Sequence, residues 1–276
     1  TNWLTTSDLA KLSIIIFVAN FLSINHKKLH DLKFLYFNLS PFIFITLVLI
    51  AAQPDLSTTF AIFIIITLIL YCSNISKYYL IISSAVIGGL GTVSILINGF
   101  QRRRFFGWSE QLIGNWSNQN SKLSEVVMDQ ANTGKQALYN GGFIGNGLGN
   151  SIIKNGYIAE VHTDFILPVI GDELGFIGVF SIFFLFLLLF LALLKIVEKS
   201  RTRFRMFVNL GLTINIIIYF LINAAYVVGI MPTTGLPMPF ISYGGSHTIF
   251  NLISIGLLFN SLSQNKKHNH LYRGLY

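Results

Sequence analysis

Long apolar runs, separated by shorter polar segments, dominate the pattern of hydrophobic and polar positions along this chain. A transmembrane helix needs about 20 apolar residues to cross roughly 30 Å of hydrocarbon. The pattern therefore predicts an all-α, polytopic integral membrane bundle. Its seven expected spans are Leu9–Leu22, Leu35–Ala52, Ser57–Cys72, Tyr78–Ile97, Leu174–Val197, Met206–Val228 and Tyr243–Leu262.

The composition supports a membrane protein. Of the 276 residues, 53% are hydrophobic and 11% are charged, whereas ordinary soluble domains carry about 25% charged residues. The single cysteine, Cys72, excludes a disulfide framework and a cysteine-based metal site. Basic cytoplasmic loops explain the net charge of +8 better than nucleic-acid binding does.

Lysine and arginine residues in the connecting segments predict the orientation, because short basic loops stay cytoplasmic. With seven spans, three basic segments fall on one side: 25–34, 195–205 and the tail 263–276. We take that side as cytoplasmic, so the N-terminus, the long loop 98–173 and the loop Gly229–Ser242 face outward. Arg102, Arg103 and Arg104 open the outer loop against this rule. They either contact lipid headgroups or bind an anionic lipid substrate.

Acidic side chains gather at the end of the long outer loop, directly before an apolar run. They are Glu160, Asp164, Asp172 and Glu173, with His162 among them. Carboxylates are costly to hold near hydrocarbon, so their presence at a membrane edge indicates a function. We expect the active site of a membrane enzyme in this stretch.

Asp164 has two interpretations. Thr163 or Asp164, standing before the apolar Phe165, is a normal N-cap for a helix. A carboxylate beside apolar groups is also a candidate general base. In that case His162 orients Asp164 or shares its proton; the alternative is that His162 is a simple hydrogen-bonding loop residue.

Asp172 and Glu173 also have two interpretations. They precede the span at Leu174, where acids in a first helical turn complement the helix dipole. Alternatively, they are ligands for a hard divalent cation such as Mg²⁺ or Mn²⁺. The cluster lacks the helical His spacing of a zinc site.

Glycine and proline mark three segments that do not continue a helix. Gly145, Gly147 and Gly149 indicate tight turns rather than a nucleotide loop, because no βαβ unit surrounds them. Met231–Ser246 is expected to fold as a loop over the outer face. In the turn at Gln53–Asp55, Asp55 either caps the next helix or lines an internal cavity.

Taken in order, these stretches resemble the FtsW/RodA family of peptidoglycan polymerases, also called the SEDS family. TTSDLAKL (Thr5–Leu12) is similar to its QPSE-x-x-K segment, and QPDLSTTF (Gln53–Phe60) to QPDLGTA. The family's two long signatures are similar to the stretches AEVHTDFILPVIGDELGFIG and MPTTGLPMPFISYGGS. GLGNS with HTDF leans towards the FtsW branch. Departures are Gly156, Ala159 and the Asp172–Glu173 pair.

The resemblance implies a single FtsW/RodA-type membrane domain over residues 1–276. The family has about ten spans, so this chain of about seven is expected to begin near the fourth. The implied activity is glycan-strand polymerisation from lipid II at the outer face of the bacterial plasma membrane. The implied partners are a class B penicillin-binding protein and other division or elongation proteins.

The resemblance also implies site residues. Asp164 matches the family's essential aspartate and is expected to be the catalytic base. Positive charge for the departing diphosphate is expected from Arg104, Lys154 and a divalent cation, Mg²⁺ or Mn²⁺, held by Asp172 and Glu173. The expected substrate-binding residues are Arg104, Lys154, Glu160, His162, Gln130, Ser242 and Gly244.

Two other functions stay open for this chain. Intramembrane charges and a cavity would also suit a lipid II transporter, although the carboxylates cluster at one face. A non-catalytic membrane scaffold of the division machinery is the second alternative.

Overall fold

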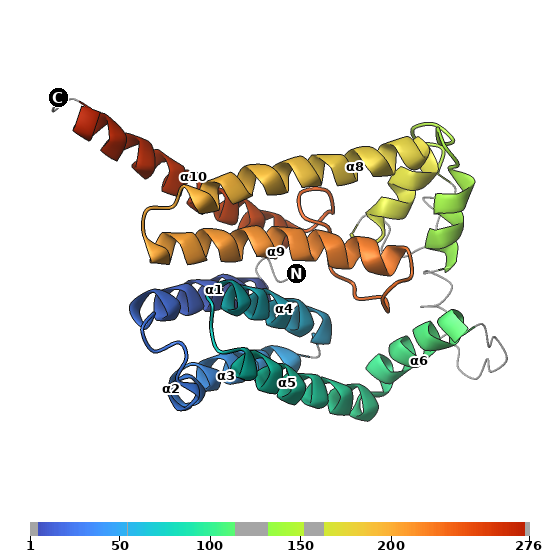
Figure 1. Cartoon of the computed structure of the whole chain (residues 1–276). Helices are drawn as coiled ribbons and strands as arrows, with labels where there is room; N and C mark the ends of the chain where they lie inside the picture. Colours follow the sequence, from blue (N-terminus) through green and yellow to red (C-terminus); the bar gives the residue numbers. More distant parts are fainter. Residues whose placement is uncertain (1–4, 54, 114–131, 152–162, 274–276) are drawn as a thin grey trace. The chain divides into compact units, whose positions relative to one another are not determined.

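A computed structural model describes residues 5–53, 55–113, 132–151 and 163–273 of the chain (Figure 1). All regular secondary structure in these ranges is helical, which confirms the predicted fold class. Each of the seven predicted spans coincides with a helix or a pair of helices. The helices are α1 (Thr6–Ile24), α2 (Leu32–Asn38), α3 (Ser40–Ala51), α4 (Leu56–Cys72), α5 (Lys77–Ile97), α6 (Gly99–Ile113), one over 132–140, α8 (Ile166–Glu198), α9 (Arg203–Val227) and α10 (Gly245–Arg273).

Several of the described helices have the length and composition of membrane spans. The requirements of length and apolar composition are both met by α1, α5, α8 and α9, and by α2 with α3 as one bent span. α4 is apolar but has only 17 residues. The protein is therefore a multi-pass membrane protein.

The span predicted over Leu35–Ala52 is broken into α2 and α3, which meet at an angle of 42°. Pro41 stands in the first turn of α3. Proline is tolerated there because the first N–H groups of a helix have no intrahelical acceptor. The same proline would remove a hydrogen bond from the interior of one continuous helix, which explains why the apolar run does not form one.

Asp55 caps α4, as one of its two interpretations predicts. Its Oδ1 accepts a hydrogen bond from the main-chain N–H of Thr58 at 3.0 Å. A side-chain oxygen at this position satisfies one of the helix's unpaired N–H groups.

The chain forms two compact units. The first comprises residues 1–85, 187–218 and 244–276, and the second comprises 86–186 and 219–243. In the first unit α4 packs against both α1 and α3. A Cβ on Gly211 would lie 2.5 Å from Cγ2 of Ile15 and 2.9 Å from Cδ1 of Ile69. Gly211 belongs to α9, so a small residue lets α9 approach α1 and α4 closely, as is common between membrane helices.

A buried polar cluster in the first unit joins the start of α1 to the start of α10. Oδ1 of Asp8 accepts a hydrogen bond from Nζ of Lys11 at 2.8 Å, and Oδ2 accepts one from the hydroxyl of Thr5 at 2.5 Å. The main-chain N–H of Thr5 donates to the hydroxyl of Ser246 at 2.9 Å. Lys11 is only 1% exposed, so its charge is compensated inside the protein.

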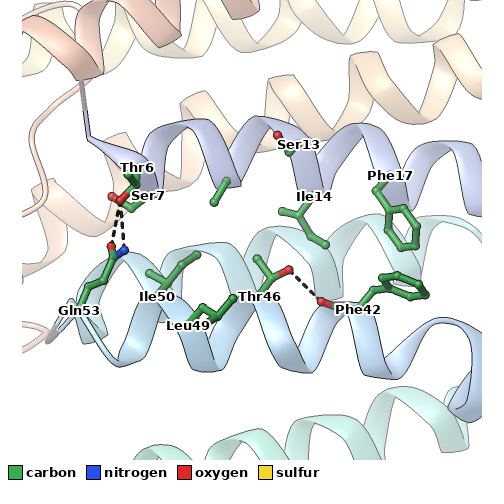
Figure 2. A pocket seen from close by; sticks show the side chains of 11 residues that line it. Thr6, Ser7, Ser13, Ile14, Phe17, Phe42, Thr46, Leu49, Ile50 and Gln53 are labelled. Atoms are coloured by element: carbon green, nitrogen blue, oxygen red, sulfur yellow. Dashed lines mark hydrogen bonds between the residues drawn. The ribbon is translucent and has the colours of Figure 1, made fainter. Parts of the chain in front are cut away.

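A cavity of about 400 Å³ lies between α1 and α3 in the first unit (Figure 2). The side chains of Thr6 and Gln53 are hydrogen-bonded to each other at its polar end. Ser13 and Thr46 donate their hydroxyl hydrogens to carbonyls of their own helices, at 2.9 and 2.8 Å. These hydroxyls are therefore satisfied, and the rest of the lining is largely apolar.

In the second unit, α8 is broken at Gly175, whose φ of 64° and ψ of −159° are not helical. The helix begins at Ile166, eight residues before the predicted start at Leu174. The expectation that Asp172 and Glu173 occupy the first turn of the helix is therefore wrong. They lie at the end of the short segment before the break.

The glycine-rich segment 141–150 supplies the hydrogen bonds that the break leaves open. Helix ends carry unpaired carbonyls and N–H groups. The N–H groups of Asn146 and Gly147 donate to the carbonyls of Asp172 and Glu173, at 2.9 and 3.0 Å. This confirms tight turns as the role of the glycines. Beyond the break, Phe176 donates to Gly142 at 2.9 Å and Ile177 to Phe143 at 3.3 Å.

Candidate active site

Asp164 lies in the turn 163–165, directly before α8, and is half-buried. Its carboxylate rests against the loop Met231–Ser242, because a Cβ on Gly235 would lie only 3.2 Å from Oδ2 of Asp164. Gly235 has a φ of 73°, which glycine adopts without strain. A glycine at this position therefore permits the close approach of loop and carboxylate.

Arg104 lies on α6 and is half-buried, whereas Arg102 and Arg103 are exposed. Burial lowers the pKa of the Arg104 guanidinium, and the negative charge of Asp164 opposes that shift. The guanidinium carbon lies 4.5 Å from the centre of the Phe100 ring. The second unit thus brings together the two residues expected to act on the reacting groups.

This arrangement places a proton acceptor near an anion-binding group. A carboxylate accepts a proton from a hydroxyl that attacks a substrate. A guanidinium binds phosphate oxygens through its fixed set of N–H donors. Nε of Arg104 is buried and makes no hydrogen bond to the described residues.

Asp172 is 1% exposed and both of its carboxylate oxygens accept hydrogen bonds. Oδ1 accepts from Nδ2 of Asn146 and Oδ2 from the hydroxyl of Ser151, each at 2.8 Å. Glu173 is also buried. Within the described ranges, no three His, Cys, Asp or Glu side chains gather as a metal site. Metal binding by Asp172 and Glu173 stays a prediction.

Of the other expected substrate-binding residues, only Ser242 and Gly244 belong to the described residues. The hydroxyl of Ser242 accepts a hydrogen bond from the N–H of Met238 at 2.8 Å, so it stabilises its own loop. Gly244 belongs to the first unit, whereas Arg104 and Asp164 belong to the second. Gln130, Lys154, Glu160 and His162 lie outside the described residues. Their roles stay predictions.

Two residues of α9 that the sequence analysis did not single out also belong to this site. Asn223 and Tyr226 both donate hydrogen bonds to the main-chain carbonyl of Asp164. The signal that would have found Asn223 is its place in the apolar run Met206–Val228. A polar side chain within a membrane span needs a partner and commonly marks a function.

Comparison with known sequences gives consistent matches. A family model described as cell cycle protein, covering FtsW, RodA and SpoVE, matches residues 4–268. A probable peptidoglycan glycosyltransferase FtsW of Taylorella equigenitalis is 32% identical, over 94% of this chain and 70% of its own length. The protein of the same name from Bacillus subtilis is 33% identical, over 94% and 66%. The chain thus spans about two thirds of these relatives.

Solved structures share the fold. One, described as a peptidoglycan synthase complex that coordinates polymerization and crosslinking, matches with a TM-score of 0.71 at 20% identity. The match covers 94% of this chain and 70% of that one. Rod shape determining protein RodA of Thermus thermophilus matches with a TM-score of 0.60 at 20% identity, over 91% and 63%.

Proposed function

The chain belongs to the FtsW/RodA/SpoVE family of cell cycle proteins, and on this basis we propose that it is a peptidoglycan glycosyltransferase. The proposed donor and acceptor is lipid II, at the outer face of the bacterial plasma membrane, in division or cell-shape maintenance. The observation that carries the proposal is the half-buried carboxylate of Asp164, which lies against Gly235 in the same unit as the half-buried Arg104.

Asp164 acts as the general base in the proposed reaction. Its carboxylate takes the proton from a sugar hydroxyl of the acceptor while that oxygen attacks the anomeric carbon of the donor. The bond from this carbon to the diphosphate oxygen breaks, and the diphosphate leaves with the bonding electrons. One carboxylate base is sufficient for such an inverting displacement, because the attacking oxygen approaches the face opposite the leaving group.

Arg104 stabilises the departing diphosphate. Negative charge develops on the leaving oxygen during the reaction, and a cation positioned near it lowers the barrier. The half-buried guanidinium is less solvated than those of Arg102 and Arg103, which strengthens its interaction with an anion.

A divalent cation, Mg²⁺ or Mn²⁺, would supply further positive charge to the diphosphate, and we retain it as a proposal. The described residues do not fit such an ion well. Both oxygens of Asp172 already accept hydrogen bonds, and Glu173 is buried beside it. No step of the mechanism is assigned to the ion.

Polymerisation of labelled lipid II by the purified protein, with and without Mn²⁺ or Mg²⁺, tests the proposal. We expect glycan strands from wild type and none from Asp164→Asn or Asp164→Ala. Asp31→Asn is the matched control, because Asp31 is an exposed carboxylate that caps α2. Normal polymerisation by Asp164→Asn would refute the assignment of Asp164 as the base, and loss of polymerisation in Asp31→Asn as well would point to a general effect of charge.

A class B penicillin-binding protein is the proposed partner, because the chain shares its fold with a chain of a peptidoglycan synthase complex. We expect the two to co-purify through the outer loops and neighbouring spans. Co-purification that survives deletion of those loops would count against this contact. Binding of the partner without polymerisation would favour the scaffold function, and lipid II movement without strands would favour the transporter.

A further inference from the structure

The main-chain carbonyl of Asp164 cannot accept the usual helical hydrogen bond from the residue four positions later. In an α-helix the N–H of each residue donates to the carbonyl four positions earlier. The residue four positions after Asp164 is Pro168, in the first turn of α8, and proline has no N–H. A donor from another element can take the place of that missing N–H, and buried carbonyls are normally hydrogen-bonded.

Two buried side chains of α9 provide that donor. The hydroxyl of Tyr226 donates to the carbonyl of Asp164, and Nδ2 of Asn223 lies 3.0 Å from the same oxygen. Asn223 is 0% exposed and Tyr226 is 1% exposed. The ring of Tyr226 also packs edge-to-face on Phe165, with centroids 5.6 Å apart.

Asn223 contacts a second main-chain carbonyl, that of Leu236, at 2.8 Å. Main-chain carbonyls only accept hydrogen bonds, so the amide must present its nitrogen to both of them. Leu236 follows Gly235, the residue against which the carboxylate of Asp164 rests. Asn223 therefore links the main chain of Asp164 to the loop at Gly235 and Leu236, and so fixes the position of that loop relative to Asp164.

We infer that Asn223 and Tyr226 are positioning residues that set the place of the Asp164 carboxylate. The catalytic meaning of this inference rests on the proposed function, whereas the hydrogen bonds do not. Neither side chain needs to touch the substrate. Both act through the main chain of Asp164, and a base displaced by about 1 Å can lose about 100-fold in rate.

Kinetics of purified variants test the inference. Tyr226→Phe removes only the hydroxyl and keeps the ring on Phe165. Asn223→Ala removes the amide that donates to the carbonyls of Asp164 and Leu236. We expect each to lower kcat by about 10- to 100-fold with little change in KM for lipid II, because the substrate contacts are kept. Unchanged kcat in both variants would overturn the inference.

Asn209→Ala is the matched control for loss of a buried amide. Asn209 is on the same helix, is 1% exposed and donates to the hydroxyls of Ser200 and Ser261, each at 2.8 Å. All three residues belong to the first unit. We expect this variant to lower thermal stability without the selective loss of kcat. An equal loss of kcat in Asn209→Ala would mean that Asn223 acts only through stability.

Hydrogen exchange of the intact protein gives a readout that does not depend on polymerisation. Tyr226→Phe and Asn223→Ala are expected to exchange faster in peptides covering 163–168 and 233–237, with α1 and α4 unchanged. If wild type makes no glycan strands, the proposed function fails, and hydrogen exchange alone still decides whether Asn223 and Tyr226 hold the main chain of Asp164 in place. Unchanged exchange in both peptides would overturn that positioning role.

Discussion

Ser151 donates a hydrogen bond to Oδ2 of Asp172 at 2.8 Å, which ties the end of the glycine-rich segment to α8. Asn146 donates to the other oxygen at the same distance. Hydrogen bonds to charged groups contribute roughly 1.5–3 kcal/mol each. We expect Asp172→Ala, which removes both bonds, to lower the free energy of unfolding by about 3–6 kcal/mol, and Asp172→Asn to cost less, because one acceptor oxygen remains.

Thermal unfolding in detergent measures this effect, with Asp31→Ala as the control. Asp31 is an exposed N-cap, whose loss costs about 1 kcal/mol. An Asp172→Ala protein with unchanged stability but no response to Mn²⁺ would show that Asp172 is a metal ligand and not a structural anchor.

Gly145→Ala is expected to destabilise the second unit more than Gly149→Ala. Both glycines have positive φ, 90° and 85°, so both substitutions carry the backbone cost of about 1–2 kcal/mol. A Cβ on Gly145 would overlap the carbonyl oxygen of Glu173, whereas one on Gly149 meets no atom within 4 Å. Overpacking adds about 1–3 kcal/mol. Equal unfolding midpoints for the two variants would contradict the contact with Glu173.

Lys11→Met should be among the more damaging single substitutions in the first unit. It leaves the carboxylate of Asp8, 7% exposed, without the ammonium that lies 2.8 Å away. Breaking a buried ion pair in this way costs about 3–5 kcal/mol. The double variant Asp8→Asn/Lys11→Met should be less destabilised than Lys11→Met, as a double-mutant cycle will show. A double variant that loses the full sum would mean that the two residues are not coupled.

Arg104→Lys should make activity sensitive to alkaline pH. Burial lowers the pKa of Arg104, and it will lower that of a lysine at this position from its ordinary value of about 10.4. The activity of this variant needs the protonated lysine. Activity is therefore present below the pKa of that lysine and is lost as pH rises through that pKa. Wild type keeps its charge over the same range. Parallel profiles of kcat/KM between about pH 7 and 10 would show that the cation is not required.

The spans were predictable because membrane thickness fixes the length of an apolar run, and each predicted run coincides with helical structure. The breaks within these helices were not predictable from the apolar pattern. Pro41 and Gly175 are visible in the sequence, but such residues permit either a bend or a restart of the helix. At Gly175 the glycine-rich segment decides the outcome, by pairing with the groups on both sides of the break.

The candidate site was predictable only in part. Asp164 and Arg104 follow from resemblance to known motifs, and the structure brings them together. Asn223 and Tyr226 were missed because their hydrogen bonds join residues about 60 positions apart, which no local pattern encodes. The missing N–H of Pro168 shows in the sequence that the carbonyl of Asp164 needs a donor, but not which residue provides it.

The hydrogen bond from Thr5 to Ser246 joins residues 241 positions apart, and this separation dictates an order of events during biosynthesis. A ribosome adds about 5–20 residues per second, so α1 waits for α10 on the order of 10–50 s. Lys11 and Asp8 are close neighbours and can pair at once, but Ser246 is synthesised 241 residues after Thr5. The nascent first unit therefore stays open at this end until Ser246 has been synthesised, and insertion factors or chaperones have that interval in which to act.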